Sequence, residues 1–175
     1  FKGMLPFLMT IVAIQVVPQI VIVTPMYSLS FRTGLYDTYS LVIFMMVATA
    51  IANPILLLKG FFDTINRSLE DAALLDGCTQ FSALIRVVLP VSLPALATAF
   101  SLSFFSGWDA YLYPMILTSS NDKVPMAVGL SRMVDIVTPW NWIMAGTVIA
   151  IIPPIIIYLL AQRYLIGGLT AGSDK

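Results

Sequence analysis

The sequence predicts an all-α protein built as a bundle of membrane-spanning helices. Of its 175 residues, 59% are hydrophobic and only 10% are charged, whereas a soluble domain carries about a quarter charged residues. The mean hydropathy is +0.93. Nine Lys and Arg balance nine Asp and Glu, so the chain offers no basic surface and is predicted not to bind nucleic acid. Its surroundings are predicted to be membrane lipid.

Long uncharged stretches define the predicted spans. Each exceeds the ~20 residues that a helix needs to cross about 30 Å of hydrocarbon, and backbone surrounded by lipid must satisfy its own hydrogen bonds. The four stretches lie between Lys2 and Arg32, Asp37 and Lys59, Arg86 and Asp109, and Asp135 and Arg163. We therefore expect spans near residues 5–30, 39–58, 90–117 and 141–163. Helix-breaking prolines predict kinks in most of them; these are Pro18, Pro25, Pro54, Pro94, Pro153 and Pro154.

The distribution of cations predicts the orientation. With four spans, both chain ends and the 59–89 segment share one side of the membrane, and the 31–38 and 118–140 segments share the other. The first side carries six of the nine Lys and Arg and the second carries three. Because cations are retained in the cytoplasm, the 59–89 loop and the C-terminus are predicted to be cytoplasmic.

Absent residue types exclude most catalytic chemistry. The chain has no histidine and one cysteine, Cys78, so histidine-based nucleophile pairs, histidine-ligated metals and internal disulfides are excluded. We predict no catalytic residue and no metal site. The sequence opens at Phe1 without an initiator methionine, and we expect it to be part of a longer chain.

The 59–89 loop carries a distinct helical pattern. Ser68 and Asp71 are spaced as in a capping box, which predicts a helix from about Leu69. Gly77 is predicted to end that helix in a left-handed conformation. Thr79 is predicted to cap a second helix, which runs to Val88 and is stopped at Pro90, where the next span begins.

Two small residues in the first helix, Ala72 and Ala73, are predicted to allow close approach by a partner. From the residues alone, a plain connecting helix pair lying on the bilayer surface is an equal alternative.

The spacing in this loop resembles the EAA motif of the membrane subunits of bacterial ABC importers, written E-A-A, three residues, G, nine residues, I-x-L-P. Here it runs Asp71-Ala72-Ala73, Gly77 and Val87-Val88-Leu89-Pro90. Asp71 replaces the glutamate and Val87 the isoleucine. Glu70 stands beside Asp71 and could share its role.

The resemblance covers nearly the whole chain. The segments KGFFDTINRSLEDAALLDGC and AQRYLIGGLTAG, and the Trp108-Asp109 pair ahead of Pro114, are similar to the permease subunit of carbohydrate importers of the maltose-transporter type. That family has six spans, so residues 1–175 would form part of one permease domain and supply its last four spans.

The resemblance implies a subunit of an ATP-driven importer of a sugar or related polar solute in the bacterial inner membrane. Its partners would be a cytoplasmic ABC ATPase dimer, a second permease subunit and an extracytoplasmic solute-binding protein. ATP and magnesium would be bound by the ATPase subunits, because this chain has no G-x-x-x-x-G-K-[ST] motif. Residues 68–78 would form coupling helices that dock on the ATPase. The residues implied in coupling are Ser68, Glu70, Asp71, Ala72, Ala73, Asp76, Gly77, Leu89 and Pro90.

The end of the chain also resembles this family. Leu169, Thr170, Ala171 and Gly172 are similar to a permease tail that reaches toward the ATPase dimer interface. Simple fraying of the terminus is the alternative for these residues.

Polar residues within the spans are candidates for the solute path. Gln15 and Gln19 are four residues apart and are predicted to share one helix face near the midplane. Asn53 precedes a proline, and Trp108, Asp109 and Tyr111 are predicted near the outer interface, where they could stack on and hydrogen-bond a sugar. The alternatives are interhelical hydrogen bonds for the glutamines, a kink partner for Asn53 and a solvated charge for Asp109.

Two other functions are weighed. An integral-membrane phosphotransferase would use an Asp-Gly motif, which Asp76-Gly77 matches only in part, because no second aspartate cluster is present to hold a cation. A simple channel subunit fits the hydropathy, but the EAA spacing argues against it.

Overall fold

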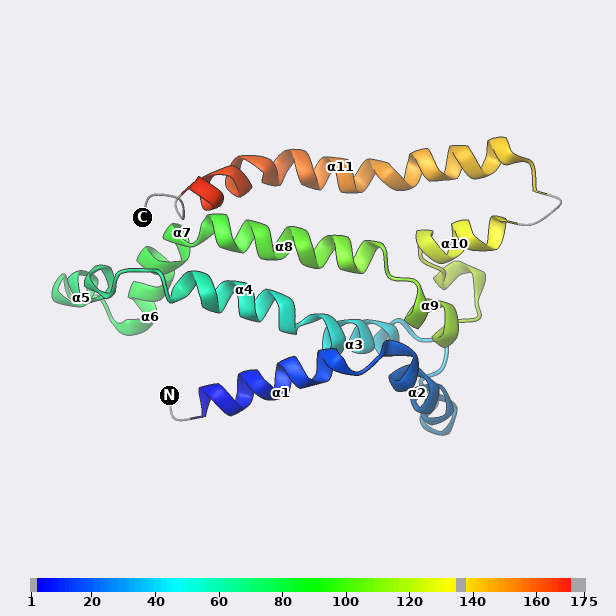
Figure 1. Ribbon diagram of the computed structural model, residues 1–175, viewed down its shortest axis with the longest axis horizontal. Coiled ribbons are helices and arrows are strands. Elements are labelled where there is room, and N and C mark those ends of the chain that lie inside the picture. The colour runs from blue at the N-terminus through cyan, green and yellow to red at the C-terminus, as the bar shows by residue number, and fades with distance from the viewer. Residues whose placement is uncertain (1–2, 135–137, 171–175) are drawn as a thin grey trace. The chain divides into compact units, whose positions relative to one another are not determined.

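The computed structural model describes residues 3–134 and 138–170, with the side chains of residues 165–170 omitted, and contains helices and no strand within those ranges (Figure 1). The all-α class predicted from the sequence is confirmed. The chain forms two compact units, which are described separately. Unit 1 comprises residues 1–52 and 103–156, and unit 2 comprises residues 53–102 and 157–175.

Helix length and composition fit a membrane protein. In the part of the chain that the structure describes, α11 (Trp140–Thr170) is apolar enough over Trp140–Tyr164 to cross a membrane alone. Each of three bent helix pairs is long and apolar enough to cross a membrane only if its two helices form one span, so the described residues can provide one to four spans. The pairs are Met4–Val16 with Gln19–Thr33, Tyr39–Ala50 with Ala52–Phe62, and Gln80–Val91 with Leu93–Trp108. The third pair begins inside the segment predicted as a loop and ends at Trp108 instead of residue 117.

The first predicted span is divided into two helices. α1 (Met4–Val16) and α2 (Gln19–Thr33) meet at an angle of 88°. The division falls at Pro18, which has no N–H to continue α1 and which holds Val17 in an extended conformation (φ −74°, ψ 122°). Pro18 then serves as the N-cap of α2.

Prolines elsewhere act in two ways. Pro54 and Pro94 lie in the first turns of α4 (Ala52–Phe62) and α8 (Leu93–Trp108), where a missing N–H costs nothing. Pro25 lies inside α2, and Pro153 and Pro154 lie inside α11, and both helices continue through them. The kinks predicted in most spans therefore fall at breaks between helices, at or just before Pro18, Pro54 and Pro94.

A tight turn joins α2 to α3 (Tyr39–Ala50) in unit 1. Gly34 is left-handed at φ +69°, and the N–H groups of Leu35 and Tyr36 both donate to Ser30 O. Thr38 caps α3 by accepting a hydrogen bond from the N–H of Leu41. These local bonds shape the turn.

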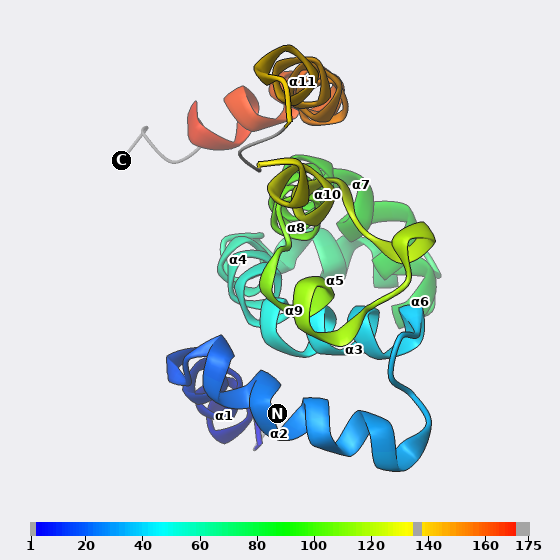
Figure 2. The ribbon, with the colours of Figure 1, turned by 90° about the vertical axis from the view of Figure 1, so that its right-hand side faces the viewer.

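The core of unit 1 lies between α2, α3 and α9 (Leu112–Leu117), and α9 lies beside α3 in Figure 2. Its buried members are Val23, Leu41, Val42, Met45, Tyr113 and Leu117. All except Tyr113 are aliphatic, so burial of apolar area is the force that holds this end of the unit together.

A short helix, α10 (Met126–Met133), packs on the first half of α11 in unit 1. A Cβ atom added at Gly146 would lie 2.7 Å from Leu130 Cδ2, so a larger residue here would displace the end of the Leu130 side chain. Val128 of α10 is fully buried. A 3₁₀ turn over Asn121–Lys123 precedes the helix.

Unit 2 contains the segment that the sequence analysis singles out. α4 leads into α5 (Arg67–Leu75) and α6 (Gln80–Ala83), followed by a π-helix over Leu84–Val88 and α7 (Leu89–Val91). α8 begins after a break at Ser92. The α5 helix packs on α6 and on the π-helix.

Candidate functional site

The first helix of the loop begins two residues earlier than predicted. Asn66 is its N-cap, with extended backbone, and its Oδ1 accepts a hydrogen bond of 3.0 Å from the N–H of Ser68. The prediction that Ser68 is the cap was therefore wrong, because Asn66 is an equally strong capping residue and the helix can start there. Ser68 and Glu70 lie in the first turn, and Glu70 is favourably placed at the positive end of the helix dipole.

Gly77 ends α5 in the manner predicted. Its φ is +87°, and the N–H of Gly77 bonds to Leu74 O at 3.1 Å while that of Cys78 bonds to Ala73 O at 3.0 Å. This is the Schellman arrangement, which satisfies the last carbonyls of a helix and needs a residue with positive φ. Thr79 then caps α6 by accepting from the N–H of Ser82, also as predicted.

The two alanines of the motif have different environments. Ala73 is buried at 6% exposure inside unit 2, where α5 packs on α6 and the π-helix. Ala72 is exposed. The prediction that both alanines face a partner is therefore corrected for Ala73, whose small side chain serves the packing of the loop itself.

Large apolar side chains project from this loop, and the sequence analysis did not identify them. Leu75 is 89% exposed and Phe81 is 71% exposed, and Leu74 is partly exposed beside them. The sequence does show these apolar residues within a charged segment. Which of them face outward becomes clear only from the structure, because the burial of Ala73 identifies the inner face of α5.

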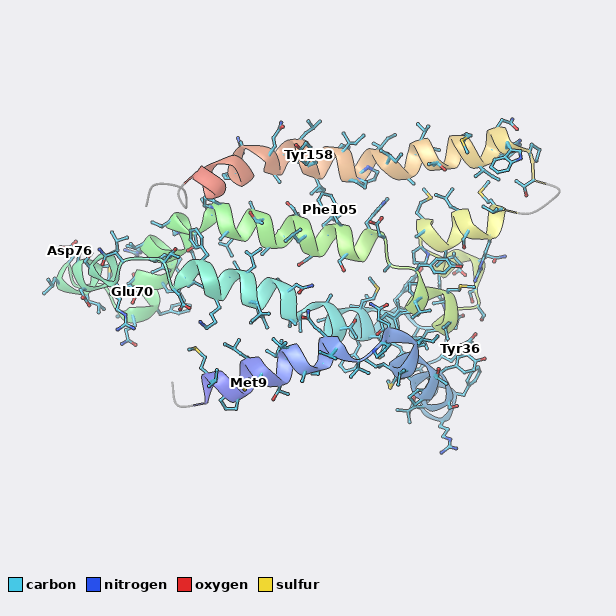
Figure 3. All side chains as sticks on the ribbon, in the orientation of Figure 1. Met9, Tyr36, Glu70, Asp76, Phe105 and Tyr158 are labelled. Atoms are coloured by element: carbon cyan, nitrogen blue, oxygen red, sulfur yellow. The ribbon has the colours of Figure 1, made fainter. Side chains whose placement is uncertain are left out.

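Three acidic side chains accompany this apolar surface. Glu70, Asp71 and Asp76 are exposed, and Figure 3 labels Glu70 and Asp76 at this end of unit 2. Within the described residues, their carboxylates have no hydrogen-bond or ion partner. A solvated helix pair with exposed leucine, phenylalanine and unpaired carboxylates has the composition of a docking surface.

The end of the motif is where the chain changes direction toward α8. The N–H of Leu89 bonds to Leu84 O, the i to i−5 pattern of the π-helix. Pro90 lies within α7 instead of ending the preceding helix as predicted. The actual interruption is at Ser92, whose Oγ donates to Val88 O at 2.7 Å. A wider π-turn relieves the clash between a proline ring and the carbonyl one turn back, so the chain passes Pro90 before it bends.

Part of the predicted C-terminal tail can be placed. Leu169 and Thr170 lie in the last turn of α11. Ala171 and Gly172 lie outside the described residues.

The predicted solute-path residues do not form one group. Gln15 lies in α1 and Gln19 begins α2, on opposite sides of the 88° bend, so they do not share a helix face as predicted. The physical reason is Pro18, which ends the helical register between them. Asn53 lies in α4, in unit 2, and is exposed.

Trp108 has a structural partner. Its indole Nε1 donates to Ala150 O at 3.0 Å, and its ring stacks on Phe104 with a centroid separation of 5.7 Å. Ala150 is four residues before Pro154, which has no N–H to offer that carbonyl. Trp108 thus supplies the hydrogen bond that the proline removes from α11.

Asp109 and Tyr111 lie in a break between helices and not within a span. α8 ends at Trp108 and α9 begins at Leu112. Pro114 explains the break, because a continuous helix would bring its ring against the carbonyl of Ala110. Asp109 is exposed and Tyr111 is 39% exposed, so both remain available to a solute.

A polar cluster that the sequence analysis missed joins two connecting segments of unit 1. We define the Asp37 cluster as Asp37, Ser119, Ser120 and Lys123. Asp37 Oδ1 accepts from the N–H groups of Ser119 at 2.9 Å and Ser120 at 3.1 Å, and Oδ2 accepts from the Ser120 hydroxyl. Lys123 Nζ lies 3.3 Å from Oδ2 and 2.7 Å from Asp37 O.

These donors stabilise the charged form of Asp37. The Ser120 hydroxyl, the two backbone N–H groups and Lys123 hold the pKa of Asp37 well below its usual range. No local pattern signals this arrangement, because the partners are more than 80 residues apart in sequence.

Together, the helical fold and the apolar helices define the class as a helical membrane protein. Comparison with known proteins gives the particular family. The model of the binding-protein-dependent transport system inner membrane component matches residues 4–170, and the chain belongs to that family.

Individual relatives agree with this family. The chain is 35% identical over 177 residues to the probable ABC transporter permease protein YurM of Bacillus subtilis, covering 100% of this chain and 59% of that protein. It is 30% identical over 177 residues to the trehalose/maltose transport system permease protein MalG of Thermococcus litoralis, covering 100% and 64%. The chain therefore spans less than two thirds of the length of these relatives.

A solved structure is also similar. A chain in the crystal structure of a bacterial ABC transporter that imports the acidic polysaccharide alginate matches with a TM-score of 0.74 and 27% identity, covering 94% of this chain and 63% of that one. The family match favours a membrane component of a transport system over the phosphotransferase and channel alternatives.

Proposed function

We propose that this chain is the membrane-spanning part of an ATP-driven importer and carries a sugar or related polar solute into the cell. The observation that carries the proposal is the α5–α6 pair of unit 2. Two hydrogen bonds close its Schellman turn at Gly77. The side chains exposed on the pair include Leu75, Phe81 and the carboxylates of Glu70, Asp71 and Asp76. An exposed apolar patch rimmed by charge supports docking of a soluble protein.

The proposed partner at this loop is a cytoplasmic ABC ATPase dimer. Movement of the ATPase would be transmitted through α5 and α6 to the π-helix, on which α5 packs, and then to α8. The family consists of permease subunits without ATPase activity, so ATP and magnesium would be bound by the partner. The tail that begins at Leu169 and Thr170 would approach the ATPase dimer interface.

The remaining partners follow from the same function. The excess of cations on the 59–89 side supports a cytoplasmic position for this loop and for the C-terminus, in the inner membrane of a bacterium. A second permease subunit would complete the bundle, and an extracytoplasmic solute-binding protein would deliver the solute to the opposite face.

The solute class is supported by the relatives. They include permease proteins named for trehalose and maltose, for arabinooligosaccharides and for sn-glycerol-3-phosphate. All these solutes are polar and rich in hydroxyl groups. Asp109 and Tyr111, exposed between α8 and α9, are the residues of this chain that we assign to solute contact.

Docking is tested by replacing Leu75 with glutamate in the assembled complex. A charge at a side chain that is 89% exposed leaves the packing of unit 2 intact, but it should weaken ATPase association by about 30-fold, the effect of losing one interface hot spot. Ala72→Arg should act in the same direction. The measurement is the amount of ATPase that co-purifies with the permease in detergent.

Leu35→Glu is the matched control, because it introduces the same charge at a partly exposed leucine in the α2–α3 turn of unit 1. Full recovery of ATPase with Leu75→Glu, or equal loss with Leu35→Glu, would refute docking at this loop. Stimulation of ATP turnover by maltose, trehalose, arabino-oligosaccharides, sn-glycerol-3-phosphate and alginate oligosaccharides would then identify the solute.

A further inference from the structure

The Asp37 cluster links the α2–α3 turn to the segment that follows α9 in unit 1. Asp37 stands in the α2–α3 turn, and its own N–H donates to Leu117 O at 3.0 Å. The carboxylate and carbonyl of Asp37 then receive the donors of Ser119, Ser120 and Lys123. A neighbouring bond from the Tyr39 hydroxyl to Asp122 O, 3.1 Å long, runs between the same two segments.

The cluster sets the path of the segment that leads to α10. The backbone N–H groups of Ser119 and Ser120 both donate to Oδ1 of Asp37. The carboxylate thus takes the place of the backbone carbonyl acceptors that a helix or strand would provide. Beyond Lys123 the chain enters α10, whose Leu130 lies against Gly146 of α11. Residues 118–123 are therefore held at one end by Asp37 and at the other by α10.

We propose that Asp37 is a positioning residue that orders residues 118–123, so that this face presents a fixed surface to the extracytoplasmic solute-binding protein. The inference rests on the proposed function and on the predicted orientation, in which the 31–38 and 118–140 segments lie outside the cell. A preordered surface binds its partner more tightly than a mobile one, because less conformational entropy is lost on association.

The chemistry of the site requires an aspartate. Asp37 has φ +59°, a left-handed conformation that aspartate and asparagine tolerate better than other residues with a side chain. An asparagine would keep this conformation and one accepting oxygen. It would present an amide N–H₂ instead of an oxygen to the Ser120 hydroxyl and the Lys123 ammonium, and the charge would be lost.

The test compares Asp37→Asn with Asp122→Asn in the complete importer. Asp122 lies in the same segment, and its backbone carbonyl, not its carboxylate, accepts from Tyr39, so its substitution removes the same charge without removing the cluster. We expect Asp37→Asn to accelerate hydrogen exchange of residues 118–123 by about two- to fivefold, the range for one partly exposed charged contact. Asp122→Asn should leave exchange unchanged.

The functional readout is stimulation of ATP turnover by the solute-binding protein, loaded with whichever solute stimulates the wild-type complex most. Asp37→Asn should raise the concentration needed for half-maximal stimulation by a similar factor and leave the maximal rate unchanged. A damaged transport step would lower the maximal rate instead.

Unchanged exchange in Asp37→Asn would overturn the inference, as would faster exchange with an unchanged half-maximal concentration. Failure of the proposed function is distinguishable, because it would appear in the wild-type complex as absence of the ATPase or of any response to a binding protein.

Discussion

Replacing Trp108 with phenylalanine should remove the hydrogen bond that Ala150 receives in place of the one lost at Pro154. The Trp108 indole donates to Ala150 O at 3.0 Å and stacks on Phe104. Phenylalanine retains an aromatic ring over Phe104 but has no N–H. The carbonyl of Ala150 would then lack both its helical donor and its indole donor.

The expected loss in unfolding free energy is about 1–2 kcal/mol. An unsatisfied buried polar group costs roughly 1–3 kcal/mol, while interhelical hydrogen bonds in membrane proteins average about 0.6 and reach about 1.7 kcal/mol. Part of any loss would come from the smaller ring and not from the hydrogen bond. A second substitution is needed to separate the two contributions.

Pro154→Ala provides that separation. Alanine at position 154 has an N–H that can donate to Ala150 O within the helix. In this background, Trp108→Phe should cost less than in the wild type by about 1 kcal/mol, because the carbonyl keeps a donor. The loss of ring area is the same in both backgrounds and cancels in the double-mutant cycle.

The assay is unfolding of the purified permease by SDS in mixed micelles, followed by far-ultraviolet circular dichroism, for the wild type, both single variants and the double variant. Trp108→Phe costing the same with and without Pro154 would refute the compensation between the indole and the proline. A cost that is larger in the Pro154→Ala background would refute it as well.

Two further predictions concern the loop and the Asp37 cluster. Asn66→Ala should destabilise α5 by about 1 kcal/mol, the usual value of an N-cap, and should accelerate hydrogen exchange of the α5 amides. Ser68→Ala should have little effect on either. A larger effect of Ser68→Ala than of Asn66→Ala would identify Ser68 as the cap. The pKa of Asp37 is lower in the folded protein than the ordinary carboxyl value of about 3.9. The ionised carboxylate therefore contributes its full stabilisation above about pH 3.9, and this stabilisation is lost as the pH falls through the folded-state pKa. Exchange of residues 118–123 should therefore be insensitive to ionisation of Asp37 between pH 5 and pH 8, after correction for the intrinsic pH dependence of exchange, and a transition near neutral pH would contradict the assignment.

Local features of the loop could be predicted from the sequence because their causes are local. Gly77 and Thr79 act on backbone groups within five residues of themselves, so spacing alone predicts the turn and the second cap. The start of α5 could not be decided in the same way. Asn66 and Ser68 are both strong caps, two residues apart, and only the backbone path through residues 63–66 selects between them.

The non-local features could not be predicted. Asp37 and Ser119 are 82 residues apart, and Trp108 and Ala150 are 42 apart, and no periodicity connects them. The same limit affected the predicted solute path. Gln15 and Gln19 have helical spacing, but Pro18 between them cancels it, and the proline should have outweighed the spacing.

The hydroxyl groups of the apolar helices bear on where solute selectivity lies. Eight of them donate their one proton to a backbone carbonyl of the preceding helical turn: Thr10, Thr24, Thr49, Ser92, Thr98, Ser101, Thr118 and Thr147. A proton that is already donated within the helix is not available to a sugar without breaking that bond. Trp108 is engaged in the same way by Ala150. These eight hydroxyl groups are therefore not free to donate to a polyhydroxylated solute, and under the proposed function we expect the solute-binding protein and the second permease subunit to contribute to selection among sugars.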